Sequence, residues 1–263
     1  MTLVRRHALS AYSALALGYL FLPIAVVILF SFNNPAGRFN YTWQGFTLDS
    51  WLNPFAVPGL LDAMKVSLEI AALSSVAATA LGTLIALALV RYGFRGRGLV
   101  NTLIFMPMTT PEIVMGASLL ALFLNLGVAT GFGTILIAHI TFNISYVVVT
   151  VKARLAGFDR HLEEAAMDLG ANEWVTFARV TLPLIAPGIL AAGLLAFALS
   201  VDDFVITAFN AGTTITFPLY VYGAARVGVP PQVNVMGTVI FVTAVGLMLA
   251  NVVYQRRRAL KGA

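Results

Sequence analysis

Charged side chains are scarce in this chain. Of its 263 residues, only 10% are charged, whereas 59% are hydrophobic. Ordinary soluble domains contain about 25% charged and about 45–50% apolar residues. A water-soluble surface cannot be built from so few charges, so most side chains must face lipid or other apolar helices. The composition therefore predicts a membrane protein, and the length suits a single membrane domain over residues 1–263.

Cysteine is absent altogether. This excludes a disulfide framework, a thiolate nucleophile and a cysteine metal site. The sequence also lacks the G-x-x-x-x-G-K-[ST] pattern, so it cannot hold ATP in a P-loop. We expect no metal, cofactor or catalytic residue on this chain, and any ATP hydrolysis must occur on a separate subunit.

Apolar runs long enough to cross a bilayer, which takes about 20 helical residues, occur six times. They cover residues 9–32, 64–90, 99–126, 132–152, 184–209 and 233–255. The first run follows Arg5 and Arg6, as in a signal peptide, but it is longer than the 7–15 residues or so of a signal h-region. The sequence predicts an all-α membrane protein with six transmembrane helices, the first of them uncleaved.

The basic residues predict the orientation of the spans. All 16 Lys and Arg residues except Arg38, Lys65 and Arg226 fall at the two ends, in the second loop or in the fourth. Because cytoplasmic loops of membrane proteins are rich in Lys and Arg, both termini are expected to be cytoplasmic. This asymmetry accounts for the net charge of +5 without any binding to nucleic acid.

The fourth loop, residues 156–183, differs from the rest of the chain because it is rich in acids. Apolar residues recur in it at helical spacing, at Leu162, Ala165, Ala166 and Leu169. Gly170 stands where a left-handed helix cap would fall, and Asn172 can cap a second short helix. The pattern predicts a helix–turn–helix elbow outside the membrane. Periodicity alone fits either a docking surface for a partner or a linker resting on lipid.

Four acids fall inside the predicted spans: Glu69, Glu112, Asp202 and Asp203. An acid at the centre of a membrane helix costs about 2.5–3.5 kcal/mol and usually marks a transport pathway. Glu69 follows Lys65 by one helical turn, so a local ion pair is expected. Asp203 fits either a cap or a pathway role, whereas Glu112 and Asp202 have no basic residue one turn away. Acids that face a water-filled cavity attract a cationic solute.

The position of these acids along their helices suggests how deep they lie. At 1.5 Å per residue, Glu112 is about 20 Å and Asp202 about 27 Å from the cytoplasmic ends of straight helices. Pro107 and Pro111 just before Glu112 should kink or unwind the third span. Irregular backbone in a membrane is tolerated where it is buried in protein or lines a cavity.

Glu164-Ala165-Ala166, then Gly170, Val180 and Leu182-Pro183 at their spacings, resemble the EAA signature of ABC importer permeases. Val180 stands where the signature usually has isoleucine. The resemblance implies a type I importer permease fold, in which this loop is a coupling helix that docks into an ATP-binding subunit. The coupling residues that it implies are Glu163, Glu164, Ala165, Ala166, Asp168, Leu169 and Gly170.

The same resemblance implies partners and a location. A transport subunit of this kind works with a second homologous permease, two ATP-binding subunits that hold ATP-Mg, and a periplasmic or lipid-anchored solute-binding protein. It is a multi-pass protein of the bacterial cytoplasmic (inner) membrane, surrounded by lipid.

Four further stretches resemble the spermidine/putrescine permease family. They are residues 108–115, 138–142, 199–203 and 227–234. Asp is common in that family where this chain has Glu112. The resemblance implies import of cationic polyamines, with Glu112, Asp202, Asp203 and Tyr222 along the pathway. Tyr222 and its neighbour Tyr220 would offer aromatic rings to ammonium groups.

Two alternatives compete with this interpretation. One is an ABC importer permease for another small solute. The other is an intramembrane serine protease, because Ser118 in the third span and His139 in the fourth superficially resemble a Ser–His dyad. A small serine at a helix interface is the commoner arrangement.

Overall fold

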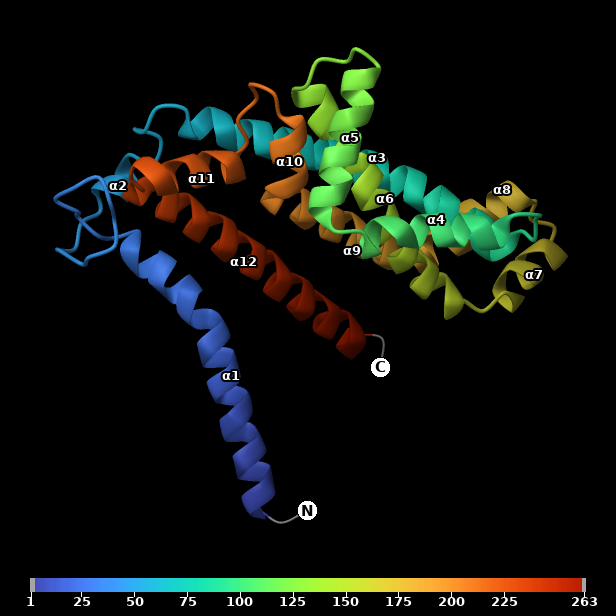
Figure 1. Cartoon of the computed structure of the whole chain (residues 1–263). Coiled ribbons are helices and arrows are strands. Elements are labelled where there is room, and N and C mark those ends of the chain that lie inside the picture. The colour runs from blue at the N-terminus through green and yellow to red at the C-terminus, as the bar shows by residue number, and fades with distance from the viewer. Residues whose placement is uncertain (1–2, 262–263) are drawn as a thin grey trace. The chain divides into compact units, whose positions relative to one another are not determined.

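The computed structural model describes residues 3–261, except for the side chains of residues 3–7, 9, 247–248, 250–252 and 254–261. Every regular element within the described residues is a helix (Figure 1). Extended chain pairs there only at one isolated bridge, between Asn33 and Phe46. The all-α prediction is confirmed.

The chain forms two compact units, one made of Met1–Leu61 with Val221–Ala263 and the other of Asp62–Tyr220. The first unit contains α1 (Leu3–Phe30), α2 (Asp49–Leu52) and α12 (Pro231–Lys261). Helix α1 packs on α12, where the Phe21 and Phe241 rings meet edge to face at 6.5 Å. Helix α11 (Phe217–Val227) crosses the boundary between the units.

The second unit carries the candidate functional residues. Its helices are α3 (Leu60–Arg91, which begins in the first unit), α4 (Arg97–Thr109), α5 (Glu112–Asn125), α6 (Phe132–Ala156), α7 (His161–Asp168), α8 (Glu173–Thr176), the π-helical turn η1 (Phe177–Thr181), α9 (Leu182–Asp202) and α10 (Val205–Asn210). Helix α6 lies at the centre, with Val147, Val148 and Val151 in one buried cluster with residues of α3 and α9. A Cβ on Gly82 of α3 would meet Val147 at 2.6 Å, so glycine permits this close approach.

Four helices of the described residues are long and apolar enough to cross a membrane without a break. They are Ser10–Phe30, Leu60–Arg91, Phe132–Ala156 and Glu173–Asp202. Three of them match the predicted spans 9–32, 64–90 and 132–152. The sixth predicted span, 233–255, lies within α12, whose described apolar part is Pro231–Gly246. The side chains of the terminal basic clusters, at 5–6 and 256–261, lie outside those described, and the orientation of the termini stays a prediction.

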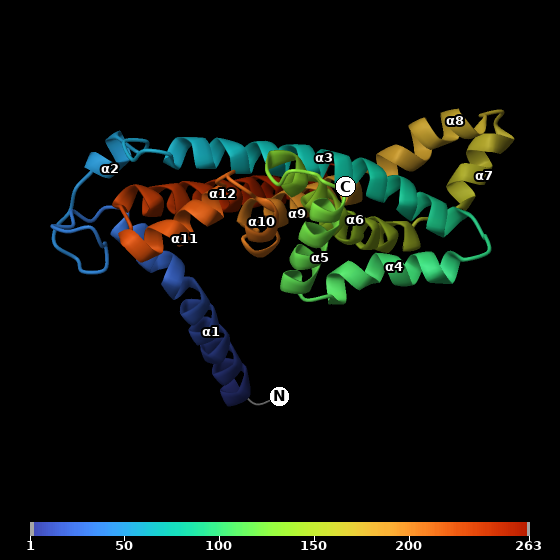
Figure 2. The same cartoon turned by 45° about the horizontal axis from the view of Figure 1, so that its top comes forward.

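The third predicted span, 99–126, is not one straight helix. It consists of α4 and α5, which meet at an angle of 110° (Figure 2). The break falls at Thr110, which is extended (φ −80°, ψ 134°), because Pro111 disfavours helical backbone in the residue before it. The predicted disruption by proline is confirmed. The assumption of one straight axis for the whole span was wrong, whereas the depth of Glu112, which directly follows the unbroken α4, stays a prediction.

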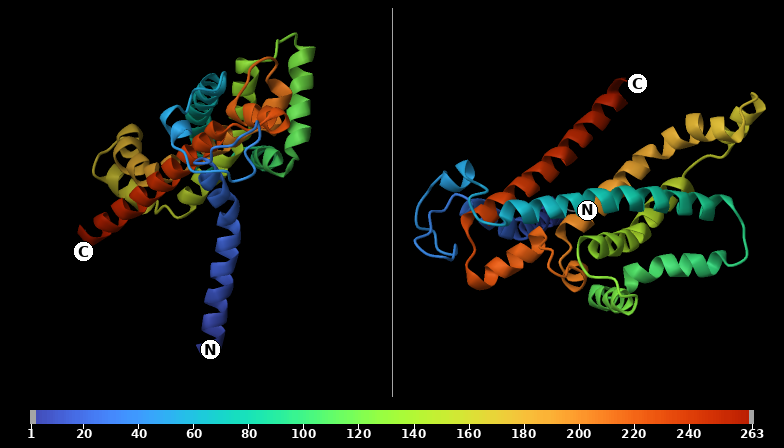
Figure 3. Two further views of the ribbon diagram at one scale, coloured as in Figure 1. Left: turned by 90° about the vertical axis from the view of Figure 1, so that its left-hand side faces the viewer. Right: turned by 90° about the horizontal axis from the view of Figure 1, so that it is seen from above.

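The fifth predicted span, 184–209, has different ends in the structure. It begins earlier, because α8 runs through η1 into α9 and makes one apolar stretch from Glu173 to Asp202 (Figure 3). It ends at Asp202, because Asp203 is extended (ψ 118°) and α10 forms a separate short helix. The second arm of the elbow is therefore continuous with a membrane helix.

Candidate functional site

The elbow between α7 and α8 has the predicted cap. Gly170 adopts φ +91°, the left-handed conformation that glycine tolerates best. The Ala171 amide donates to the Ala166 carbonyl at 3.1 Å, and the Gly170 amide donates to the Met167 carbonyl at 2.9 Å. These two bonds form a Schellman motif, which ends α7 and turns the chain.

The second arm of the elbow also starts as predicted. The Asn172 side chain accepts a hydrogen bond from the Val175 amide at 2.9 Å and caps α8. From there the backbone stays helical through η1 into α9. Any displacement of α8 is therefore carried directly to a transmembrane helix.

The apolar face predicted for the elbow is uncovered in this chain. Of the four predicted residues, Leu162 and Ala165 are exposed, Leu169 is 90% exposed, and Ala166 is partly buried. An exposed apolar patch rimmed by acids is typical of an interaction surface.

Two neighbouring acids on α7 point to different environments. Glu163 is turned inward and forms an ion pair with Arg91 at the end of α3. Thr181 of η1 donates a hydrogen bond to the same carboxylate oxygen of Glu163. The Glu164 side chain is 64% exposed, and its polar partner among the described residues is His161 on its own helix, at 3.1 Å. Glu164 is thus open to a partner, whereas Glu163 holds α7 against its own chain.

Glu112 and Asp202 each stand directly beside a break between two helices. Glu112 is the first residue of α5, directly after the Thr110–Pro111 break. Asp202 is the last residue of α9, directly before the extended Asp203. Both side chains are exposed within the isolated chain. Half-helices that begin or end inside a membrane commonly flank solute sites in transporters.

The helices that follow these two breaks pack tightly on each other. A Cβ on Gly116 of α5 would lie 2.8 Å from the Phe209 ring and 3.3 Å from the Ile206 Cα of α10. Glu112 precedes Gly116, and Asp202 precedes Ile206, each by four residues. One contact between α5 and α10 therefore brings the two breaks, and the acids beside them, into one region. No direct contact joins the two carboxylates in the described residues.

Tyr146 on α6 is a candidate that the sequence reasoning missed. It packs against the buried cluster of Ala138, Phe142 and Ile206, and its ring meets Phe142 edge to face at 4.9 Å. Met115 of α5, three residues after Glu112, packs against the same cluster. The helical i, i+4 spacing of Phe142 and Tyr146 was visible in the sequence, but their packing with Met115 and Leu119 of α5 could not be read from it.

Asp203 is held inside the protein. Its Oδ1 accepts hydrogen bonds from the Thr207 amide at 2.8 Å and from the Thr207 hydroxyl at 3.0 Å. The His139 Nε2 lies 2.9 Å from the Thr207 hydroxyl oxygen, and the His139 Nδ1 lies 2.6 Å from the Ser200 Oγ. Of the two roles considered for Asp203, these contacts fit the cap. Its carboxylate caps the start of α10 and is linked to α6 through Thr207 and His139.

In this cluster each group donates a hydrogen bond to the next one, from Ser74 at one end to Asp203 at the other. The Thr207 hydroxyl donates to Asp203, so its oxygen accepts from His139 Nε2–H. In the tautomer with hydrogen on Nε2, His139 accepts at Nδ1 from Ser200, whose oxygen accepts from Ser74 of α3 at 3.0 Å. Each donor has an acceptor and the chain ends on a carboxylate, which is how a buried polar cluster is satisfied. It joins α3, α6, α9 and α10.

The Ser–His dyad of the protease alternative is not formed. Ser118 donates to the Val114 carbonyl of its own helix at 2.7 Å, and both nitrogens of His139 are engaged elsewhere. Ser200 does contact His139, but it is buried in the last turn of α9, where the backbone amides bond within the helix and do not form an oxyanion hole. The protease alternative is therefore wrong.

Two further residues with expected roles are Glu69, as the ion-pair partner of Lys65, and Tyr222, as an aromatic ring on the pathway. The ion pair between Lys65 and Glu69 is absent: both side chains are exposed, where such a pair contributes little. Within the described residues Arg91 forms an ion pair with Glu163, while His139 lies 3.5 Å from Asp203 and His161 lies 3.1 Å from Glu164. One face of the Tyr222 ring is covered by the Arg226 guanidinium, 4.5 Å from the ring centroid.

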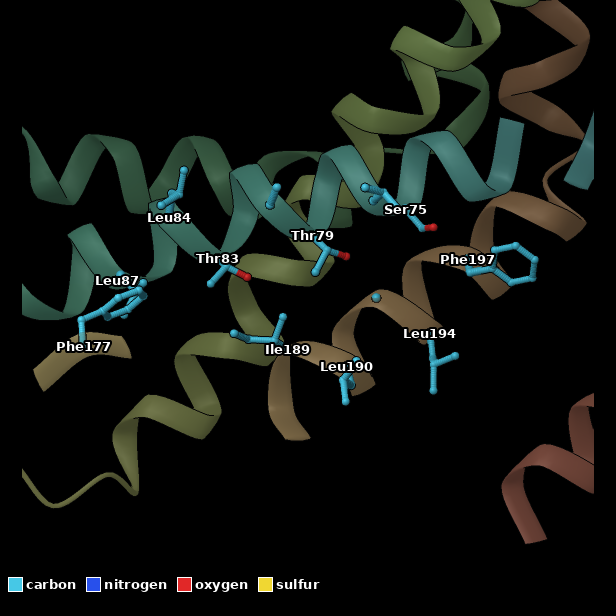
Figure 4. A pocket seen from close by; sticks show the side chains of 13 residues that line it. Ser75, Thr79, Thr83, Leu84, Leu87, Phe177, Ile189, Leu190, Leu194 and Phe197 are labelled. Atoms are coloured by element: carbon cyan, nitrogen blue, oxygen red, sulfur yellow. The ribbon is translucent and has the colours of Figure 1, made fainter. Parts of the chain in front are cut away.

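A groove of about 650 Å³ runs between α3 and α9 (Figure 4). Its walls are mostly apolar, and its polar residues are Ser75, Thr79 and Thr83. No carboxylate lines it, so it does not offer the charge that a cationic solute needs. The acids at the helix breaks fit such a solute better.

Taken together, the apolar helices, the breaks that carry acids and the projecting elbow define a helical membrane transport protein. Residues 78–258 match the family described as "Binding-protein-dependent transport system inner membrane component". The chain belongs to this family and is a permease component without an ATPase site of its own.

Curated relatives cover nearly the whole chain. The spermidine/putrescine transport system permease protein PotC of Escherichia coli K12 is 42% identical over 89% of this chain and 88% of its own length. PotC of Haemophilus influenzae is 37% identical over 94% and 96%. The putrescine transport system permease protein PotI of Escherichia coli K12 is 39% identical over 94% and 90%.

Solved structures share the fold at low sequence identity. A chain of a bacterial ABC transporter involved in the import of alginate superposes with a TM-score of 0.70 at 17% identity, over 97% of both chains. A chain of the MetNI methionine ABC transporter superposes with a TM-score of 0.61 at 16% identity, over 73% of this chain and 92% of that one. The fold is that of ABC importer permeases.

Proposed function

We propose that this chain imports cationic polyamines such as spermidine and putrescine, as one permease subunit of an ATP-driven importer in the bacterial cytoplasmic membrane. The observation that carries the proposal is the placement of Glu112 and Asp202. Each acid stands at a helix break, and the packing of α5 on α10 brings the two breaks into one region.

The chemistry of the region suits a polyamine. Ammonium groups joined by methylenes are attracted by separated carboxylates and can also rest on aromatic rings. Tyr146 supplies such a ring in the cluster that also includes Met115, three residues after Glu112. The names of the relatives PotC and PotI, which are polyamine permeases, support the same solute class.

Tyr222 contributes less in this proposal. Arg226 already covers one face of its ring, and a guanidinium there repels a second cation. Asp203 contributes by capping α10 beside Asp202 rather than by touching the solute.

The subunit works in a complex. Half of a pathway is formed by this chain and the other half by a second homologous permease. Two ATP-binding subunits hold ATP-Mg, and a solute-binding protein delivers the solute from outside. A solved relative of the same fold is a transporter in complex with a solute-bound periplasmic protein, which supports this arrangement.

The elbow transmits the work of the ATP-binding subunits. Its exposed residues Glu164, Leu169 and Gly170 lie on the surface that docks to them. ATP binding closes those subunits, moves α7 and α8, and through the continuous η1 and α9 opens the cavity to the outside. Hydrolysis returns the permease to its inward-facing state.

The test is the double variant Glu112→Gln with Asp202→Asn. We expect uptake of radiolabelled spermidine and putrescine into whole cells to fall at least about tenfold, because two attractive charges are lost at the solute site. Glu69→Gln is the matched control, an exposed acid in an unbroken helix. Unchanged uptake in the double variant, at equal membrane abundance, would show that the pathway assignment is wrong.

A further inference from the structure

Arg91, the last residue of α3, is the centre of a cluster at the elbow. Its Nη2 donates to the Glu163 carboxylate of α7 and, at 3.2 Å, to the Thr181 hydroxyl of η1. Its guanidinium carbon lies 5.9 Å from the centroid of the Phe177 ring, which is also on η1. One side chain thus contacts both arms of the elbow.

The cluster is shielded from solvent. The Arg91 and Glu163 side chains are 29% and 17% exposed, and Thr181 is buried. Screening by salt is weaker for such a pair than for a pair on the open surface. A second bond reinforces the attachment, since Arg160 at the start of α7 donates to the Val90 carbonyl of α3 at 2.9 Å.

The elements joined at Arg91 continue into two different apolar helices, α3 and α9. Helix α3 is an apolar helix of 32 residues, and η1 is the π-helical start of the stretch that continues as α9. The links from α7 to α3 are the Arg91 cluster and the Arg160–Val90 bond, since the sequence between the two helices runs through α4, α5 and α6. π-helical turns often mark functional sites.

We propose that Arg91 is a positioning residue for energy coupling. By holding Glu163, Thr181 and Phe177 together, it makes the ends of α3 and α9 and the elbow move as one body. When an ATP-binding subunit displaces α7, the displacement is then transmitted to both α3 and α9. The inference rests on the proposed function of the elbow.

This assigns the two adjacent acids of α7 separate tasks. Glu164 faces outward and is free for the partner, while Glu163 faces Arg91 and fastens the helix to its own chain. Loss of Arg91 therefore leaves the docking surface in place and removes the attachment behind it.

The test uses the full complex in proteoliposomes, with its solute-binding protein loaded with spermidine. We expect Arg91→Ala to assemble and to hydrolyse ATP, while spermidine imported per ATP falls about tenfold, within the usual range of a coupling free energy. Arg91→Lys, which keeps the charge but not the forked donor, should recover part of the loss. Arg95→Ala is the matched control, an exposed arginine of the next loop.

A double-mutant cycle distinguishes an Arg91–Glu163 link from two independent effects. We expect Arg91→Ala with Glu163→Ala to be no worse than Arg91→Ala alone. Additive losses, or an Arg91→Ala complex as tightly coupled as the wild type, would overturn the proposal. If Arg91→Ala does not assemble, the cycle is run with Arg91→Lys and Glu163→Gln and judged by the same rule.

Measurements on the wild-type complex distinguish a failure of this proposal from a failure of the proposed function. If spermidine neither stimulates its ATPase nor enters the vesicles, the polyamine function is wrong. If the wild type is coupled and the Arg91 variants match it, only the role of Arg91 is wrong.

Discussion

The Nε2 atom of His139 lies 3.5 Å from Oδ1 of Asp203, and the two side chains are only 3% and 6% exposed. The Thr207 hydroxyl, within hydrogen-bond distance of both, lies between them in the bonding chain. The residue before Asp203, Asp202, has its side chain exposed. Two consecutive acids therefore have different environments, one inside the helix packing and one facing outward.

Asp203→Ala should lower the stability of the folded protein, and solute affinity should not be its primary effect. The change removes the acceptor of two Thr207 hydrogen bonds and leaves buried donors unpaired, which costs about 1–3 kcal/mol. Thermal unfolding of the purified complex measures it. Asp202→Asn is the control, and it should keep the unfolding temperature while reducing uptake. Equal unfolding temperatures for Asp203→Ala and the wild type would contradict the capping role.

His139→Ala and Ser118→Ala should behave in opposite ways. The first removes the bridge between Ser200 and Thr207 and should destabilise the protein by about 1–3 kcal/mol. The second removes a hydroxyl bonded only to its own helix, so uptake and stability should stay at wild-type level. Uptake and thermal unfolding are measured for both. Complete loss of uptake in a normally folded Ser118→Ala would revive a chemical role for that serine.

Gly116→Ala tests the packing that brings the two helix breaks together. The added Cβ would lie 2.8 Å from the Phe209 ring and 3.3 Å from the Ile206 backbone, so α5 and α10 must separate. Overpacking of this kind costs about 1–3 kcal/mol, and uptake should fall as the acids move apart. Gly133→Ala on α6 is the matched control, since its Cβ would meet nothing within 4 Å. Normal uptake by Gly116→Ala would show that the α5–α10 contact does not shape the pathway.

The elbow was predictable because its determinants are local. Gly170 and Asn172 cap neighbouring backbone groups, and such bonds follow from sequence spacing. Pro111 likewise acts on the residue beside it. The break at Asp203 was missed because its cap belongs to a cluster that includes His139 of another helix. Long-range pairs of this kind leave no periodic signal in a single sequence.

Glu163 illustrates the same limit. It stands beside Glu164 in the signature, and the sequence assigned both acids to the docking surface. Its partner Arg91 is 72 residues away, so nothing in the local pattern distinguishes the inward-facing acid from the outward-facing one. The six apolar runs were recognisable, but the 110° bend between α4 and α5 depends on packing as well as on proline.

Leu169→Ser should detach the ATP-binding subunits while leaving the permease folded. Leu169 is 90% exposed, so its loss should change stability by no more than about 0.5 kcal/mol. If this residue docks in the partner's cleft, co-purification of the ATP-binding subunit and solute-stimulated ATP hydrolysis should both fall severalfold. Leu126→Ser is the matched control, because Leu126 is 66% exposed in the turn after α5 and belongs to no proposed docking surface. Intact co-purification with Leu169→Ser, at an unchanged unfolding temperature, would show that this apolar face does not bind the ATP-binding subunit.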